Sequence, residues 1–290
     1  MKRLIAGLAL ASAATFVTAV PAQAQAAPKN PLVAVKKQLV PGKGVKFTER
    51  TTLITPIFRD IFVRRTGTIA FRKNGVAASD STGKLNVRAS DLGDEAPELA
   101  KAMVKPERTI WLGNTSYLSG GIWAHVLPED KKWFKLSQGT TGGVTGVYGQ
   151  PLNVAEPATL KAMLKNAKVT GNGYSGKITV NEVRKISPWF RHTLMMDKFP
   201  AKVLKTQITW RLSVDAKGLP TRLVTTYPLG VLDGAPKKSE TVSVDTRYTG
   251  WGTKVTIKAP SESDASAKPK DGQEETLDHI EMLDGVKVGL

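Results

Sequence analysis

The side chains that most often perform catalysis or bind metals are scarce in this sequence of 290 residues. It has no cysteine, which excludes thiol nucleophiles, thiolate zinc sites, iron–sulfur clusters and disulfide bonds. The histidines, His125, His192 and His279, lie far apart, and the sequence has neither an H-E-x-x-H metal motif nor a G-x-S-x-G nucleophile motif. We therefore predict a protein that is not an enzyme, with no catalytic residue, no metal site and no cofactor.

Two further groups of residues have an ordinary structural explanation. The acidic pairs Asp94-Glu95 and Glu274-Glu275 fall at an expected helix start and in an acidic tail, where carboxylates are usually solvated. Residues 139–149 are rich in glycine but contain no lysine or arginine, and Gln-Pro follows where a phosphate-binding loop would lead into a helix. We interpret this glycine-rich stretch as a mobile loop.

Residues 1–26 have the composition of a secretory signal peptide. Lys2 and Arg3 precede an apolar run over residues 4–20, and a site of the Ala-x-Ala type follows at residues 22–24. The apolar run is shorter than the roughly 20 residues of a membrane-spanning helix. We expect cleavage and secretion to the extracellular space or the cell envelope, without a lipid anchor, because the chain has no cysteine.

Charge is distributed unevenly along the chain. The formal net charge is +17, whereas residues 261–290 are rich in Asp and Glu. Residues 27–260 are therefore more basic than the whole chain, which favours transient contact with an anionic membrane or cell-wall surface. We expect no nucleic-acid partner, because an exported protein seldom meets one and the basic residues are dispersed along strands. An ordinary solvated surface is the alternative explanation of the charge.

The chain is expected to form one domain followed by a tail. Residues 27–260 lie in the size range of a single sheet-rich domain, which we expect to be a monomer. Residues 261–290 combine acidic and small polar residues with few aromatic ones, a composition that predicts disorder.

Alternating apolar residues predict strands throughout the domain. In the clearest case Ile208, Trp210, Leu212 and Val214 alternate with polar residues, and a hairpin turn leads to a partner strand at 221–227. The other expected strands cover residues 45–53, 65–72, 85–87, 109–112, 116–118, 133–136, 242–248 and 255–257, and the expected helices cover residues 30–40, 94–105, 156–167 and 182–198. Such alternation is typical of an antiparallel sheet with one covered face, and the helices must supply the cover. The predicted fold class is α+β, a curved antiparallel β-sheet with helices packed on its concave apolar face.

Five blocks of the sequence resemble the LppX/LprG lipoprotein family of actinobacteria, in the order in which that family has them. They are residues 107–136, 159–170, 174–183, 211–223 and 248–260. The family is similar to the LolA/LolB half-barrels, so the resemblance implies a half-barrel whose apolar cavity holds acyl chains and which has no catalytic residues. The sequence departs from the family at residues 24–26, where Ala-Gln-Ala replaces the lipobox cysteine, and this departure puts membrane tethering in doubt.

An acyl chain needs only an apolar trough, because each buried methylene contributes about 0.8 kcal/mol without directional bonding. Seven apolar residues are expected to point inward from the sheet and to line such a cavity: Phe47, Ile69, Phe71, Trp111, Trp210, Leu212 and Val244. The sequence does not distinguish this cavity from a solid core of the same side chains. We therefore predict an exported carrier of lipid or glycolipid, with a ligand-free secreted envelope protein that makes protein or cell-wall contacts as the alternative.

Overall fold

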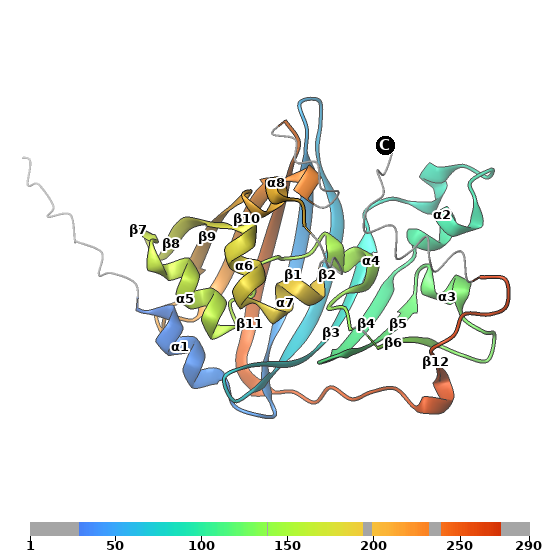
Figure 1. The fold of residues 1–290 in the computed structure, drawn as a ribbon, viewed down its shortest axis with the longest axis horizontal. Helices are drawn as coiled ribbons and strands as arrows, with labels where there is room; N and C mark the ends of the chain where they lie inside the picture. The colour runs from blue at the N-terminus through green and yellow to red at the C-terminus, as the bar shows by residue number, and fades with distance from the viewer. Residues whose placement is uncertain (1–28, 138, 194–198, 232–238, 274–290) are drawn as a thin grey trace, which may run out of the picture.

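The computed structural model describes residues 29–137, 139–193, 199–231 and 239–273. Within these ranges the strands form one 12-stranded sheet in the order β12-β6-β5-β4-β3-β2-β1-β11-β10-β9-β8-β7 (Figure 1). Every neighbouring pair is antiparallel except β12 and β6. The strands are β1 (Lys43–Ile54), β2 (Arg59–Arg72), β3 (Gly75–Leu85), β4 (Glu107–Leu112), β5 (Thr115–Gly120), β6 (Trp133–Leu136), β7 (Lys168–Thr170), β8 (Gly173–Thr179), β9 (Gln207–Val214), β10 (Pro220–Pro228), β11 (Thr241–Lys254) and β12 (Ala265–Ser266).

Short helices cover one face of this curved sheet. Figure 1 shows α5, α6 and α7 in front of the strands at the β8–β11 side, and α4 in front of the central strands. The helices are α1 (Pro31–Gln38), α2 (Glu98–Met103), α3 (Trp123–Val126), α4 (Gly143–Val147), α5 (Pro157–Lys165), α6 (Val180–Ile186), α7 (Pro188–Thr193) and α8 (Ala201–Leu204), with 3-10 turns η1 (Ala89–Leu92), η2 (Leu229–Val231) and η3 (Glu262–Asp264). The α+β class, with a curved antiparallel sheet and helices on its apolar face, is confirmed.

The period of two in the sequence determines which side chains the helices cover. In β9 the apolar residues Ile208, Trp210 and Leu212 are buried, whereas the intervening Thr209 and Arg211 are exposed. β11 has the same alternation in its first half. Because antiparallel partners in register point to the same side, the buried residues of neighbouring strands form continuous rows under the helices.

The buried side chains form two apolar clusters. The larger cluster joins β1, β2 and β8–β11 to α1 and α5–α8. The smaller one lies between β5, β6, α2 and α3 and is centred on Leu118, Trp123, Val126 and Phe134. Residues 139–150, which carry several buried polar side chains, lie over the central strands.

Several local expectations are wrong for identifiable reasons. Up to Thr193 the helix expected over 182–198 is two helices, because Pro188 lacks the backbone N–H that a continuing helix would require, and residues 194–198 lie outside the described range. Its α6 portion starts at Val180, where Thr179 and Glu182 form a capping box. The strand expected at 255–257 is absent from the described structure, and its two alternating apolar residues are too few to extend β11.

The strands β3, β7 and β8 were missed or misplaced. β3 ends at residue 85, where we expected a strand to begin. Its body was not predicted because it contains small residues with weak strand propensity, such as Ala77, Ala78, Ser79 and Ser81. β8 has Gly176 between Tyr174 and Ile178, where the alternation would require an apolar residue, and β7 is only three residues long. β7 and β8 are strands because they pair with their neighbours in the sheet, and not because their residues favour a strand.

The terminal predictions fall partly outside the described residues. The proposed signal peptide, residues 1–26, lies wholly outside them. Of the tail, residues 261–273 are described and add η3 and β12, which pairs with β6 at Trp133 and Phe134. This ordered part was not predicted from composition, and residues 274–290 lie outside the described range. No helix among the described residues is long and apolar enough to cross a membrane.

Candidate ligand pocket

The residues predicted to line a cavity all lie in the larger apolar cluster. Each of the seven has at most 5 % of its surface exposed. Phe47 and Ile69 line a pocket, whereas Trp111 packs edge-on against Trp189 with ring centroids 6.1 Å apart. The structure therefore brings the seven together in one core but does not arrange them around one common space, and their role as cavity lining stays a prediction.

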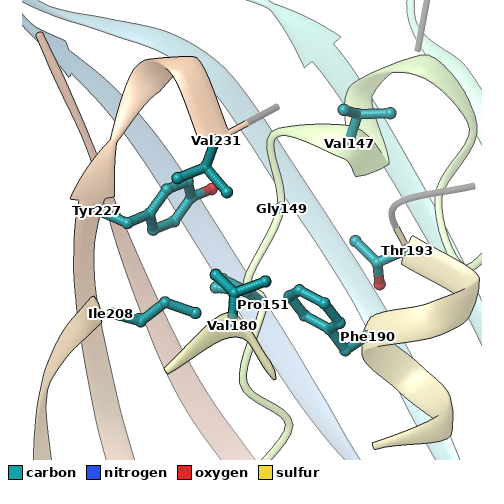
Figure 2. Close-up of a pocket in the computed structure, with 9 residues that line it drawn as sticks. All are labelled: Val147, Gly149, Pro151, Val180, Phe190, Thr193, Ile208, Tyr227 and Val231. Carbon is teal, nitrogen blue, oxygen red and sulfur yellow. The ribbon is translucent and has the colours of Figure 1, made fainter. Parts of the chain in front are cut away.

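An apolar pocket lies between the sheet and the helices α6 and α7, at residues the sequence analysis did not select. Its lining comes from β9, β10, η2, α6, α7, the end of α4 and the segment after it, and consists of Val147, Gly149, Pro151, Val180, Phe190, Thr193, Ile208, Tyr227 and Val231. Figure 2 shows Phe190 approaching from α7 and Tyr227 from β10, on opposite sides of this space. The atom-free space, including its open mouth, is about 280 Å³.

The lining of this pocket contains no charged residue. The Thr193 hydroxyl donates to the Trp189 carbonyl at 2.9 Å and lies 2.6 Å from the Thr141 hydroxyl, so its bonding capacity is used within the protein. The Tyr227 phenol is neutral at physiological pH, and burial raises its pKa still further above that range. The pocket therefore offers hydrocarbon contact and has no charged group to bind an ionic ligand.

A second pocket lies on the other side of the Gly149–Pro151 segment. It has about 230 Å³ of atom-free space and is lined by Phe47, Glu49, Ile69, Gln150, Leu152, Asn153, Trp189, Thr246 and Tyr248. Most of its polar atoms bond to one another: the Glu49 carboxylate accepts from Arg65, from the Thr246 hydroxyl and from the Gln150 backbone N–H. Among the residues that line this pocket, the Asn153 amide nitrogen is buried without a hydrogen-bond partner.

The Asn153 side chain is oriented by the backbone of Ala155. Its carbonyl oxygen accepts from the Ala155 N–H at 2.9 Å, so the amide nitrogen is the end left for another partner. A buried donor without an acceptor costs about 1–3 kcal/mol. A ligand oxygen in the second pocket would remove that cost.

Both pockets are narrow in this structure. Each leaves room for about one water molecule beyond the space that the surrounding side chains take up. An acyl chain would need more space than either pocket offers in this structure. The helices α6 and α7 are short and meet at Ser187-Pro188, where the α-helical hydrogen bonding is interrupted.

Glu156 connects these helices to α5. Its carboxylate accepts from the Ser187 and Thr159 hydroxyls and from the Trp189 backbone N–H. Burial raises the pKa of Glu156, and these hydrogen bonds oppose that rise. The junction of α6 and α7 is therefore held to α5 through one buried carboxyl group.

The glycine-rich segment 139–149 is packed against the sheet, which corrects the expectation of a mobile loop. Glu107 accepts from the Thr145 N–H and hydroxyl, both at 2.6 Å, and from the Trp123 indole at 3.1 Å. Burial raises the pKa of Glu107, and these bonds lower it in part. Gly142 and Gly149 lie so close to the Arg65 guanidinium that any side chain at either position would collide with it.

The buried residues behind this segment were not selected from the sequence because they alternate like any other strand residues. Arg65 donates to Glu49 at 3.0 Å, and both side chains have only 2 % of their surface exposed. The signal available in the sequence was a charged residue at an inward strand position, Glu49 between Phe47 and Thr51. In the described residues no group of histidine and acidic side chains is placed to hold a metal ion.

No protein-family model and no curated protein matches this chain. Solved structures similar to it include a LolA superfamily protein from Nitrosomonas europaea, with 11 % identity and a TM-score of 0.29 over 74 % of this chain and 89 % of that one. A DUF1329 family protein from Desulfovibrio piger has 9 % identity and a TM-score of 0.29 over 76 % of this chain and 93 % of that one.

A third similar structure is a domain from Vibrio parahaemolyticus whose name proposes a role in outer membrane lipoprotein sorting. It has 9 % identity and a TM-score of 0.28, over 87 % of this chain and 98 % of that one. Because these TM-scores are all below 0.5, we base the function on the residues of this chain.

Proposed function

We propose that this protein is an exported, non-enzymatic carrier that binds the acyl chains of a lipid or glycolipid between its sheet and the helices α6 and α7. The observation that carries the proposal is the uncharged pocket lined by Phe190, Ile208 and Tyr227. An acyl chain there would gain about 0.8 kcal/mol for each methylene removed from water. The resemblance to the LppX/LprG family supports the same function.

Binding requires the covering helices to separate from the sheet. The contacts of Glu156 across the α5–α6–α7 junction are the ones that an outward shift would strain or break. The second pocket would then join the first around Gln150, and the Asn153 amide would donate to an ester or hydroxyl oxygen of the ligand. The carrier thus combines a long apolar contact with one polar anchor.

The test is to fill the first pocket. Val180→Phe adds a ring beside Phe190 and Ile208, and should weaken fatty-acid binding at least tenfold in a fluorescent displacement assay. Val169→Phe is the matched control, because Val169 is 57 % exposed on β7, and it should bind like the wild type. Circular dichroism would establish that both variants fold.

Native mass spectrometry of protein from its own host gives an independent readout. A co-purified lipid that is lost in Val180→Phe would support the carrier. Absence of any bound lipid, together with no fatty-acid binding by the wild type, would reject it.

The alternative is a ligand-free secreted envelope protein that makes protein or cell-wall contacts. The observation that favours it is the small space in both pockets, each with room for about one water molecule. In either case we propose a secreted monomer without a lipid anchor that makes transient contact with an anionic membrane or cell-wall surface. Acid hydrolysis and mass analysis of the mature protein would detect a covalent lipid and contradict this.

A further inference from the structure

The face of the sheet opposite the helices carries basic residues that are far apart in sequence but aligned by strand register. Lys84 of β3 lies opposite Arg64 of β2, and Arg64 lies opposite Arg50 of β1. The same row continues through Asp245 and Val224 to Arg211 of β9. Six neighbouring strands thus contribute to one row, which spans about 24 Å at the usual strand spacing.

A second row runs beside the first. It starts at Arg108 of β4, passes through three threonines and ends at Arg247 of β11 and Arg222 of β10. The threonines are Thr82, Thr66 and Thr48, and all three are exposed. We call these two rows, with the exposed Lys46 on β1, the basic face.

Two acidic residues on this face are already paired with arginines. Asp80 receives two hydrogen bonds from Arg108 at 2.9 and 2.7 Å, and Asp245 receives two from Arg222 at 2.8 Å each. Among the described residues the remaining cations have no acidic partner; they are Lys46, Arg50, Arg64, Lys84, Arg211 and Arg247. Arg64 donates to the neutral amide of Asn86.

The register places like charges directly opposite one another. This occurs for Arg50 with Arg64, for Arg64 with Lys84 and for Arg222 with Arg247. Such cross-strand pairs are destabilising, because the two side chains project side by side from the same face. An anion lying between them would convert repulsion into attraction, and arginine is well suited to hold phosphate oxygens through paired N–H donors.

We propose that the basic face binds a linear anionic polymer with a phosphodiester backbone, such as the poly(glycerol phosphate) of a cell wall. The helices pack on the concave side of the curved sheet, so the basic face on the other side is convex, and a flat bilayer would touch only part of a row. A flexible polymer can follow the whole row across the strands. The threonine hydroxyls of the second row would add neutral donors beside the cations.

This inference deepens the cell-wall part of the proposed function and does not depend on the lipid pocket. The basic face and the pocket lie on opposite sides of the sheet, as the alternation of Arg211 with Trp210 and Leu212 requires. Variants of the basic face should therefore retain fatty-acid binding. The polymer-binding and fatty-acid-binding assays can therefore fail independently, and each tests its own proposal.

The experiment measures binding of the mature chain to purified poly(glycerol phosphate) over a range of salt concentrations. We expect binding that weakens as salt rises, because polymer counterions are released on contact. The double variant Arg50→Glu/Arg64→Glu should bind at least tenfold more weakly. The control Lys36→Glu/Lys37→Glu changes net charge equally, on two exposed residues of α1, and should stay within twofold of the wild type.

A second variant and a second probe make the outcome unambiguous. Arg211→Glu/Arg247→Glu alters the other end of the basic face and should also lose polymer binding. This variant serves as the test if Arg50→Glu/Arg64→Glu does not fold. Equal losses in the α1 control and in the basic-face variants would overturn the proposal, because general charge would then be sufficient. Binding only to vesicles of 70 % phosphatidylcholine and 30 % phosphatidylglycerol would also overturn it, in favour of a membrane contact.

Discussion

The two faces of the sheet differ although the same strands build both. Along β9, Trp210 is 1 % exposed under the helices, while its neighbour Arg211 lies on the solvent side. Along β1, Phe47 and Glu49 are buried and Lys46 and Arg50 are exposed. The inner face is stabilised by removal of apolar area from water, whereas the outer face gathers charges whose mutual repulsion opposes folding.

This difference separates residues kept for stability from residues available for binding. An inner substitution changes close-packed contacts and alters the free energy of unfolding. An outer substitution leaves packing intact and mainly alters what the surface attracts. Substitutions at adjacent positions of one strand should therefore have effects that differ several-fold.

The largest effect is expected for a charge introduced on the inner face. Trp210→Glu removes a buried indole and places a carboxylate in the apolar cluster, which should lower the free energy of unfolding by about 5 kcal/mol or more. Arg211→Glu, the adjacent outer residue, should change it by less than about 0.5 kcal/mol. Urea denaturation of both variants measures the contrast, and similar losses would contradict the division between the faces.

The buried ion pair tests the polar part of the inner face. Arg65→Met leaves the Glu49 carboxylate without its cation in a site that is only 2 % exposed, and should cost about 3–5 kcal/mol. The double variant Glu49→Gln/Arg65→Met removes both charges and should recover part of that loss. If the single and double variants are equally unstable, the loss does not come from an unpaired charge on Glu49.

The sequence predicted the structure correctly where the neighbours of a residue along the chain determine which face of the sheet it lies on. The alternation around Trp210 and Leu212 identified an inner face, and both residues are buried there. The pocket was not predicted because its lining meets only after folding: Val180 and Phe190 come from helices, and Tyr227 comes from a distant strand. No local spacing links these three positions.

The same limit explains the basic face. Arg50, Arg64 and Lys84 are separated by more than a dozen residues each, so they read as dispersed charges along the chain. Only the strand register, set by the β1–β2 and β2–β3 hairpins, brings them into one row. The glycine-rich segment was misread because its charged partners, Arg65 and Glu107, lie in strands distant in sequence.

A smaller effect should appear in the pH dependence of stability. Burial raises the pKa of Glu107 and Glu156 in the folded protein, so the folded state binds protons more tightly than the unfolded chain at these groups. Their contribution to stability is therefore fully present below the unfolded pKa of about 4.5 and is lost as pH rises through the higher folded pKa.

Glu107→Gln removes one of these two titrations. The stability difference between wild type and variant, measured by urea denaturation at intervals between pH 4 and 7, should favour the wild type most at the acidic end. A difference that grows in favour of the wild type as pH rises would show that the hydrogen bonds from Thr145 and Trp123 outweigh burial at this carboxyl group.

The smallest effect concerns the repulsion within the basic face. Arg64 has a like charge opposite it on both sides, Arg50 and Lys84, so Arg64→Thr should raise the free energy of unfolding by about 0.5 kcal/mol at low salt. The gain should shrink in 0.5 M salt, because ions screen exposed charges. Arg108→Thr is the matched control, since it breaks the paired bonds to Asp80 and should lower stability. Opposite signs for two exposed arginines on one face would establish that register, and not charge alone, decides whether an arginine on this face stabilises the fold. If both variants are destabilised equally at low salt, the cross-strand repulsion is negligible, and the basic face lacks the unfavourable energy that a bound polyanion would relieve.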